Sequence, residues 1–462
     1  MKKILYALLT FALLAYVVWS LGFIHQRGLL ADSDGLDLKR MEKADSAIYK
    51  AIADGEIPGA VLCVVRRAAD GQGVGNVAYL KAYGNRSVIK EEGIADSIAM
   101  TTDVVFDLAS LSKCTGTTLA LMRLVEDGQL RLTDRVDRYI EDFKPWDSIA
   151  EQKGKMLKGK KLKNKKRAAK PQVVKREHIT VKHLLTHTSG LPAYINVGQF
   201  MARFGEYDSI PGALHDSLVG YIATEVERRT RPGVKVRYSC LNFIILQAII
   251  ETITGRTLDE FAKQEVFDPM RLKNTWYHNL DSCDKPFDEQ TPIAPTELLS
   301  DGTLLCGEVH DSMARLINRG VSGNAGVFST AEDLAVVASM LINGGVLRFP
   351  SEGWRGKLGF TEAVRLYSEP TINAFFRVPE QFENLDRALG WDAADDRGGC
   401  YGDLMTPDCV ASHTGYTGTS IAIDYEQGVA VILLTNRVHP KDKGSLSRTR
   451  AVVSNIVMSA LE

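Results

Sequence analysis

The stretch from Phe106 to Asp127 constrains this chain most, because it sets a serine and a lysine three residues apart at the start of an apolar segment. On a helix, residues three apart share a face with their Cβ atoms about 5 to 6 Å apart, so the Ser110 hydroxyl would meet the Lys113 amine. Serine needs an adjacent base to become a good nucleophile, and a desolvated lysine can be that base. The free N–H groups of a first helical turn also favour developing negative charge. The stretch therefore predicts an acyl-transfer nucleophile.

The spacing alone is weak support, because the same chain contains it three times. Ser87 with Lys90, and Ser282 with Lys285, match it as well. The first pair lies in a polar stretch, and a proline directly after Lys285 discourages a helix there. Only Ser110 opens a segment with apolar residues at helical spacing, ended by an Asp-Gly pair. Taken alone, this stretch also fits a helix cap beside a solvated lysine.

The N-terminus reads as a membrane anchor. Two lysines precede an uncharged apolar run at residues 4–24. About 20 residues suffice to span a bilayer, and the run exceeds the roughly 7 to 15 residues of a signal-peptide core. It ends without a small-residue cleavage site, and the lysines favour a cytoplasmic N-terminus. We expect residues 1–25 to be an uncleaved signal anchor with the rest of the chain outside the cytoplasm, the alternative being a cleaved signal peptide.

The remainder, residues 36–462, reads as one large two-lobed unit. A helical pattern at 36–53 is followed by β-rich runs at 60–65 and 77–83, which predict a hairpin before the serine segment. This order favours an α/β layered fold over a repeat array. The formal net charge of −1 gives no indication of a nucleic-acid partner.

A basic insertion interrupts this unit at about 151–177. It is dense in lysine and arginine and almost without acidic residues. Such a run is usually a solvated, disordered loop. The alternative is a basic tongue on anionic lipid or cell-envelope polymer, in which each charge contributes about 1 kcal/mol.

Cysteines and histidines give no metal signature. His183 and His187 are four apart, but no third ligand accompanies them. An odd number of cysteines leaves at least one thiol, and Cys400 with Cys409 offers one local disulfide. No metal and no cofactor is expected. The cysteines are residues 63, 114, 240, 283, 306, 400 and 409.

Two later segments supply partners for a serine–lysine pair. Tyr238 stands at the mouth of a long apolar helix that runs through Ile253, where a tyrosine can relay a proton. The run that starts at His413 leads into predicted strands at 420–425 and 429–435. A helix at about 447–461 closes the chain.

Together these residues resemble the serine β-lactamase and penicillin-binding-protein superfamily. Its three motifs are Ser-x-x-Lys, a Tyr- or Ser-led second motif and a Lys/His-Thr-Gly. Here they read Ser110-Leu111-Ser112-Lys113, Tyr238-Ser239 and His413-Thr414-Gly415, in that order. The flanking sequence looks like the class C-type branch, which holds β-lactamases, D-alanyl-D-alanine carboxypeptidases and esterases. The supporting stretches are 57–60, 183–191, 307–311, 325–330 and 434–437.

The resemblance implies a β-lactamase/transpeptidase-like α/β (α+β) fold. That fold has an antiparallel sheet flanked by helices and an all-helical lobe, with the site between them. By this resemblance, Ser110 is the acylated nucleophile, Lys113 its base and Tyr238 the proton relay. No metal or cofactor is implied.

The resemblance also implies an oxyanion hole and substrate contacts. The backbone N–H groups of Ser110 and Tyr416 would form the hole. His413, Thr414 and Gly415 would bind substrate. Asn242 is a further expected substrate-binding residue, because it follows the version of the second motif that reads Tyr-Ser-x-Leu-Asn.

Two departures bear on the substrate. Cys240 stands where lactamase-like members have Asn, which removes a hydrogen bond to a substrate amide and weakens the case for a true β-lactamase. His413 replaces lysine, so we expect weaker or pH-dependent carboxylate recognition. Rival spellings of the second motif begin at Tyr194 and Ser322, in less suitable contexts.

The sequence thus predicts a membrane-anchored, outward-facing serine hydrolase of the penicillin-recognising type. Its substrate would be a peptidoglycan-derived peptide, an ester or an amide. The alternative within the class is a carboxylesterase. The alternative of another class is a non-catalytic envelope-binding or sensor module.

Overall fold

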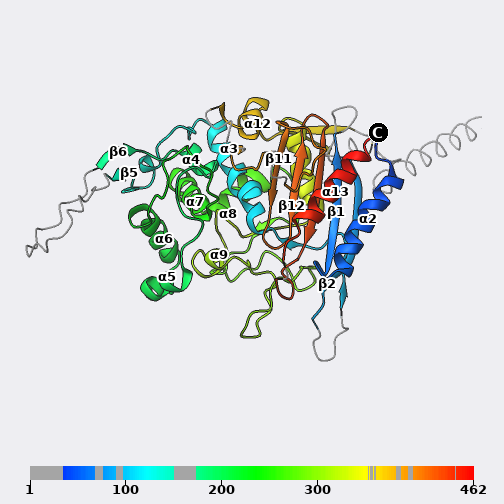
Figure 1. Cartoon of the computed structure of the whole chain (residues 1–462), viewed down its shortest axis with the longest axis horizontal. Coiled ribbons are helices and arrows are strands. Elements are labelled where there is room, and N and C mark those ends of the chain that lie inside the picture. The colour runs from blue at the N-terminus through cyan, green and yellow to red at the C-terminus, as the bar shows by residue number, and fades with distance from the viewer. Residues whose placement is uncertain are drawn as a thin grey trace, which may run out of the picture.

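The computed structural model describes residues 35–462 except 68–75, 90–96, 150–172, 352, 354–356, 358–359, 381–386, 394–398 and 443. A β-sheet with helices on its faces lies beside a mainly helical lobe (Figure 1). The sheet is built from the two ends of the chain, and most of the helical lobe from its middle. This is the two-part α/β architecture that the sequence predicts.

The described residues form a six-stranded sheet in the order β11-β12-β13-β1-β2-β3. The β-branched run of β1 pairs antiparallel with β13 on one side and with β2 on the other. Side chains alternate along a strand, so β1 serves two cores. Val61 and Cys63 face the core shared with the helical lobe, whereas Leu62 and Val64 face the outer core. A sheet covered on both faces requires this nearly continuous apolar sequence.

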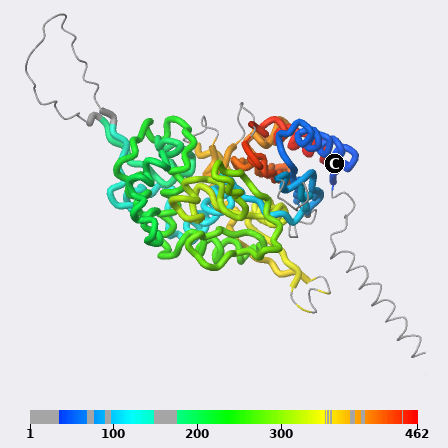
Figure 2. The backbone as a smooth tube through the Cα atoms, turned by 90° about the horizontal axis from the view of Figure 1, so that it is seen from below, coloured from blue at the N-terminus to red at the C-terminus, as the bar shows by residue number. Residues whose placement is uncertain are grey.

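Helices from the two ends of the chain cover the outer face of the sheet. α2 and α13 pack on each other there (Figure 2). In α2, Met41, Ala44, Ile48 and Ala51 are buried at helical spacing, and the Asp37 carboxylate caps the N-terminus by accepting the Arg40 N–H. α10 packs on the inner face.

The centre of the helical lobe is α7. Its first eleven residues are buried, which is why apolar side chains dominate every face of this helix. It contacts α3, α4, α6 and α8. Gly255, at φ +66°, ends it as a left-handed cap. Tyr238 and Ser239 immediately precede the helix, so its position sets theirs.

The helices of the described residues are α2 (Leu38–Ala53), α3 (Leu119–Glu126), α4 (Val181–Leu185), α5 (Val197–Phe204), α6 (Ala213–Thr224), α7 (Cys240–Thr254), α8 (Leu258–Ala262), α9 (Ser312–Leu316), α10 (Ala331–Ile342), α12 (Glu369–Phe376) and α13 (Ser447–Ser459). The short 3-10 helices are η1 (Ala109–Leu111), η3 (Val136–Arg138) and η4 (Gly205–Tyr207), and the π-helices are η2 (Lys113–Thr118) and η5 (Lys263–Phe267).

The strands are β1 (Gly59–Arg66), β2 (Asn76–Ser87), β3 (Ile98–Ala99), β4 (Phe106–Asp107), β5 (Trp146–Ile149), β6 (Val173–Glu177), β7 (Trp276–Tyr277), β8 (Val327–Ser329), β9 (Val346–Pro350), β10 (Thr361–Arg365), β11 (Val410–Thr414), β12 (Ser420–Asp424) and β13 (Val429–Thr435). Small sheets β4-β8-β7, β9-β10 and β5-β6 complete the described part.

The predicted first helix, first hairpin, late strands and last helix are confirmed by α2, β1–β2, β12–β13 and α13. The serine segment is less regular than a single helix, since a 3-10 turn and a π-helical stretch precede α3. The disulfide that Cys400 and Cys409 could have formed is absent: all seven cysteines lie in the described ranges, and each is a free thiol.

The basic insertion is only partly described. Its end at 173–177 forms β6, which pairs with β5, so these residues form a strand and not the disordered loop that was expected. Ion pairs join Arg176 to Asp147 across this pair of strands and Arg231 to Glu177 at its end. Residues 150–172 lie outside the described part.

The predicted anchor at residues 1–25 also lies outside the described residues. None of the helices in the described part of the chain is both long and apolar enough to cross a bilayer. The anchor therefore stays a prediction.

Candidate active site

Ser110 lies in a strained turn held by a buried carboxylate. Ala109, just before it, has φ +46°, a left-handed conformation that is rare for a residue other than glycine. The Asp107 side chain accepts the Ala109 N–H at 2.8 Å and the His310 N–H at 2.7 Å. The Thr417 hydroxyl donates to the Asp107 carbonyl at 2.8 Å. The turn is thus fixed from three directions.

Lys113 is fully buried directly beside the serine. Its Nζ donates to Ser110 Oγ at 2.9 Å and to the Asn324 carbonyl at 2.8 Å. The same atom lies 5.0 Å from the Tyr238 ring centroid and 5.7 Å from that of Phe243. The predicted contact between the serine and the lysine is therefore present.

The protonation of Lys113 reflects two opposing effects. Burial disfavours the ammonium and lowers its pKa, whereas negative charge on the Cys240 thiol or on the Tyr238 hydroxyl would raise it. With either of these groups ionised, the net direction is a raised pKa, so the last proton of the cluster stays on Lys113. The resting lysine is therefore an ammonium that donates to Ser110, and a proton must leave this cluster before Lys113 can act as a base.

Tyr238 connects the helical lobe to the sheet. Its ring lies 4.5 Å from the His187 ring and 6.1 Å from the His413 ring, between centroids. Burial raises the pKa of Tyr238, although the neighbouring Lys113 ammonium acts to lower it. The resting phenol is therefore neutral and can donate a proton to a leaving group.

His187 packs against the Tyr238 ring and binds the backbone of the next residue. Its Nδ1 accepts the Ser239 backbone N–H at 3.1 Å, so this nitrogen carries no proton. The Asn242 amide nitrogen lies 3.2 Å from the same Nδ1, and Asn242 Oδ1 accepts from the Ser189 hydroxyl at 2.5 Å. Burial holds the pKa of His187 well below its usual range. The Asn242 side chain is thus occupied with internal partners. This arrangement favours a positioning role, and its predicted contact with substrate stays a prediction.

His413 lies on β11, the edge strand of the sheet, and its side chain is buried. Its Nδ1 lies 2.9 Å from the Thr414 carbonyl, which assigns the proton to Nδ1, and its buried Nε2 has no acceptor or donor among the described residues. Burial, together with the cations of Lys113 and Arg387, lowers the pKa of His413 well below its usual range. The sequence led us to expect a histidine whose charge, and with it the recognition of a carboxylate, depends on pH. The structure indicates a neutral imidazole instead.

The turn after β11 brings the third motif against the serine turn. A Cβ on Gly415 would lie 2.4 Å from the Leu108 carbonyl oxygen, so only glycine permits this approach. The Thr419 hydroxyl donates to the same Leu108 carbonyl at 3.0 Å. Among the described residues the Tyr416 N–H has no acceptor, as a predicted oxyanion donor requires. Thr414 lines the neighbouring cleft.

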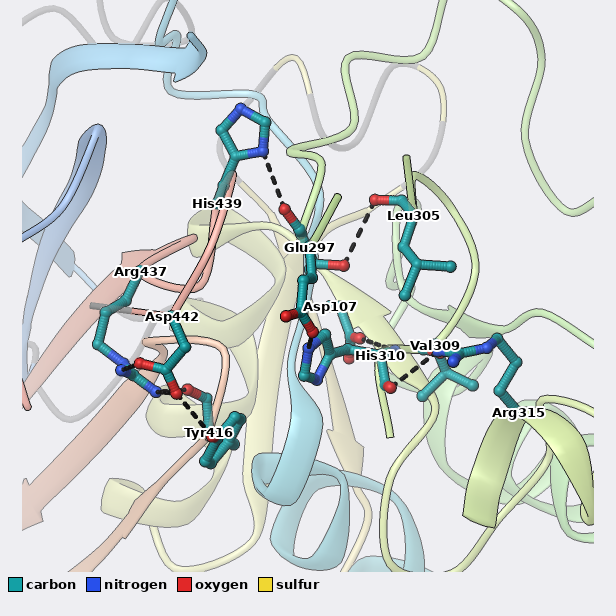
Figure 3. A network of polar contacts seen from close by, with 11 residues as sticks. Asp107, Glu297, Leu305, Val309, His310, Arg315, Tyr416, Arg437, His439 and Asp442 are labelled. Carbon is teal, nitrogen blue, oxygen red and sulfur yellow. Dashed lines mark hydrogen bonds and ion pairs between the residues drawn. The ribbon is translucent and has the colours of Figure 1, made fainter. Parts of the chain in front are cut away.

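The Tyr416 side chain is exposed yet fixed at the rim of the site (Figure 3). Its hydroxyl donates to Asp442 at 2.6 Å, and its ring stacks on His310 with 5.7 Å between centroids. His310 Nε2 lies 3.0 Å from Glu297 Oε2. The Arg437 guanidinium donates to the Tyr416 carbonyl at 2.7 Å.

Sequence reasoning missed several residues of the site. Both rival motif segments lie beside it: Asn324 supplies a carbonyl to Lys113, and the Tyr194 hydroxyl donates to Asp311. Cys240 is buried at the N-terminus of α7, where its ionised form would interact with Lys113. The Gly-rich context of 323–326 was the only available signal for Asn324, because a main-chain acceptor has no residue-type signature.

A cleft of about 640 Å³ opens beside Tyr238 and Thr414. Its lining includes Arg387, Arg448 and Arg450, together with two aspartates, Asp392 and Asp403. Arg387 pairs with Asp392. Among the described lining residues, three cations stand against two carboxylates, and this excess of positive charge suits a substrate with a negatively charged group.

Comparison with known proteins agrees with this geometry. A family model described as Beta-lactamase matches residues 40–454. The chain belongs to the Beta-lactamase family. An N-acetylmuramyl-L-alanine amidase of Bacillus subtilis (strain 168) is 30% identical over 427 residues, covering 88% of this chain and 83% of the relative. A protein of Escherichia coli O157:H7 with the provisional name D-alanyl-D-alanine carboxypeptidase is 28% identical over 430 residues, covering 88% and 84%.

Solved structures of the same fold align over most of the chain. EstCE1, a hydrolase with promiscuous acyltransferase activity, has a TM-score of 0.62 at 20% identity and covers 91% of this chain and 99% of its own. The octameric penicillin-binding protein homologue from Pyrococcus abyssi has a TM-score of 0.56 at 21% identity, covering 91% and 76%. The fold and the family together identify this member as a serine hydrolase. The roles of its individual site residues stay predictions.

Proposed function

We propose that this hydrolase cleaves the carboxyl-terminal residue from peptidoglycan-derived peptides through an acyl-enzyme on Ser110. The arginine-lined cleft beside Tyr238 and Thr414 carries this proposal, because a terminal carboxylate is the group that such a cleft would bind. The names of the amidase and carboxypeptidase relatives support the same substrate class.

Before acylation, the Lys113–Tyr238 pair must lose one proton to solvent. Once the pair has lost it, Ser110 passes its hydroxyl proton to the pair and attacks the substrate carbonyl. The N–H groups of Ser110 and Tyr416 stabilise the oxyanion. Tyr238 then protonates the leaving amine, and water hydrolyses the resulting ester with the same pair as base.

The test is release of D-alanine from a peptide ending in D-Ala-D-Ala, using the full chain in detergent. The same peptide as a C-terminal amide, and a short-chain ester, serve as comparison substrates. We expect the free acid to be cleaved fastest, and Arg448→Ala to reduce that preference. Arg229→Ala, another exposed arginine, is the matched control. Equal rates on acid and amide, unchanged by Arg448→Ala, would contradict carboxylate recognition.

A carboxylesterase is the second candidate. The neutral His413 favours it, since the third motif then supplies no cation for a carboxylate. Turnover of the ester with no release of D-alanine would select this candidate. Stable labelling by a fluorescent penicillin, with turnover of neither substrate, would instead select a non-catalytic binding module.

We further propose that residues 1–25 anchor the protein in the membrane with its catalytic domain outside the cytoplasm. The uncharged run at 4–24 behind two lysines supports this placement. Protease added to intact spheroplasts should degrade the domain, and the mature protein should keep its N-terminus. Loss of about 30 residues in cells would contradict the anchor.

A further inference from the structure

Two buried arginines bind consecutive carbonyl groups in the turn that follows β11. Arg450, from α13, donates through Nη2 to the Gly415 carbonyl at 3.0 Å and to the Thr419 carbonyl at 2.9 Å. Arg437 donates to the Tyr416 carbonyl at 2.7 Å. Arg437 also pairs with Asp442, so its charge is compensated. In the described part of the chain, Arg450 has no such carboxylate within ion-pair distance.

Burying this guanidinium is unfavourable for the fold. Arg450 is 9% exposed, and burial lowers its pKa to about 10, so it is still a cation at neutral pH. A buried cation needs strong compensation, and a helix that merely covers a sheet would be better served by an apolar side chain. The location of Arg450 suggests what the cation does.

The peptide group between Gly415 and Tyr416 contains both the carbonyl that Arg450 holds and the N–H that the oxyanion hole needs. In a trans peptide the C=O and the N–H point in opposite directions. Holding the carbonyl toward α13, behind the sheet, therefore turns the Tyr416 N–H away from α13. The Gly418 N–H also donates to the Gly415 carbonyl, at 3.1 Å. A hydrogen bond from a cation to a carbonyl polarises the peptide and strengthens its N–H as a donor.

We propose that Arg450 is a positioning residue for the oxyanion hole: it fixes and polarises the Gly415–Tyr416 peptide from behind the sheet. Arg450 touches no reacting atom. It acts through the Tyr416 N–H, and the inference rests on the proposed acyl-enzyme chemistry. Arg450 would therefore stabilise the transition state more than the bound substrate, because negative charge develops on the substrate oxygen only in the transition state.

Arg228 provides a matched control in the helical lobe. It is 8% exposed, it donates to the backbone carbonyls of Ala223 and Val226, and burial lowers its pKa to about 10 as well. Losing either arginine therefore removes a buried cation and two carbonyl contacts. Of these two arginines, only Arg450 binds the peptide group between Gly415 and Tyr416.

The test compares Arg450→Met, Arg450→Lys and Arg228→Met in the full chain purified in detergent. Readouts are kcat and KM on a p-nitrophenyl ester, the Kd of a boronic acid that forms a tetrahedral adduct on serine, and Tm. We expect Arg450→Met to lower kcat at least tenfold with little change in KM, because this ester has no carboxylate for the cleft arginines to bind. The boronate Kd should rise by a similar factor. Arg450→Lys, which keeps the charge, should fall between Met and wild type. Arg228→Met should lower Tm and leave kcat and boronate binding near wild type.

Equal kcat values in Arg450→Met and Arg228→Met would overturn the assignment, as would a fall in kcat without weaker boronate binding. If Arg450→Met does not fold, Arg450→Lys decides: wild-type kcat and boronate Kd would overturn it. An infrared measurement adds an independent check, since the acyl-enzyme carbonyl stretch should move to higher frequency when the donor weakens. A wild-type protein that a fluorophosphonate does not label at Ser110 would refute the proposed function and this inference with it. If the wild type is labelled at Ser110 but the Arg450 variants keep wild-type kcat and boronate Kd, the inference alone would be refuted.

Discussion

Gly415→Ala tests the contact between the third motif and the serine turn. The added methyl would lie 2.4 Å from the Leu108 carbonyl oxygen and 2.1 Å from Thr419 Oγ1. The hydroxyl can rotate away, but the carbonyl belongs to the backbone of the turn that carries Ser110. An ordinary contact begins at 3.4 Å, so the two backbones must separate by 3.4 − 2.4 = 1.0 Å.

A separation of this size moves the Tyr416 N–H relative to Ser110. A misplacement of about 1 Å can lower a catalysed rate about 10²-fold, and losing one oxyanion donor costs about 2.7 to 4 kcal/mol of barrier. We therefore expect kcat on a p-nitrophenyl ester to fall between about 10² and 10³-fold. Substrate binding should change far less, because the cleft beside Tyr238 keeps its lining.

Gly220→Ala is the matched control. Gly220 lies inside α6, and a Cβ there meets nothing within 4 Å. Alanine in a helix is more stable than glycine by up to about 1 kcal/mol, so this variant should gain stability and keep full activity. A Gly415→Ala protein with normal kcat would refute the claim that the close approach of the two turns builds the oxyanion hole.

Three further predictions concern protonation and positioning. Asp107→Ala leaves the N–H groups of Ala109 and His310 without their acceptor. The free energy of unfolding, measured with urea, should therefore fall by about 1 to 3 kcal/mol for each N–H group, and kcat should fall about tenfold. Unchanged stability would contradict the role of the carboxylate. Cys240→Ala removes a thiol whose ionised form would raise the pKa of Lys113, so the rise of kcat/KM with pH should move to lower pH. An unmoved profile would show that the thiol does not act on the lysine. His413 has a lowered pKa in the folded state, so below about pH 6.5 the unfolded chain binds more protons and the free energy of unfolding falls as the pH decreases. His413→Asn should reduce the slope of the unfolding free energy against pH by up to about 1.4 kcal/mol per pH unit. An equal slope in both proteins would show that His413 is not a buried neutral base.

The fold was largely predictable because its elements carry strong local signals. The apolar period of α2, the β-branched runs of β1 and β13, and the Gly-terminated helix α7 each specify their own conformation. The order of the three motifs then predicted the two-lobed arrangement. The irregular start of the serine helix was not predictable, since the 3-10 and π turns result from tertiary contacts of buried residues such as Lys113.

The site was predictable where side-chain chemistry is distinctive. Ser110, Lys113 and Tyr238 converge as expected. Protonation was not predictable, because burial and neighbouring charges decide it: His413 is neutral and Lys113 is charged, the reverse of what each residue's role would suggest. The parts played by Asn324, Arg437 and Arg450 were not predictable either, because these residues bind backbone carbonyls or supply one.

The most direct measurement of the central claim is the mass of the intact protein after reaction with a penicillin or a fluorophosphonate. Wild type should gain the mass of one probe, and digestion should place it on the peptide that contains Ser110. Ser110→Ala should gain no mass, and Ser87→Ala, which changes another serine of the same spacing, should react like wild type. An adduct that persists in Ser110→Ala, or wild type that gains none, would contradict the assignment of Ser110 as the nucleophile.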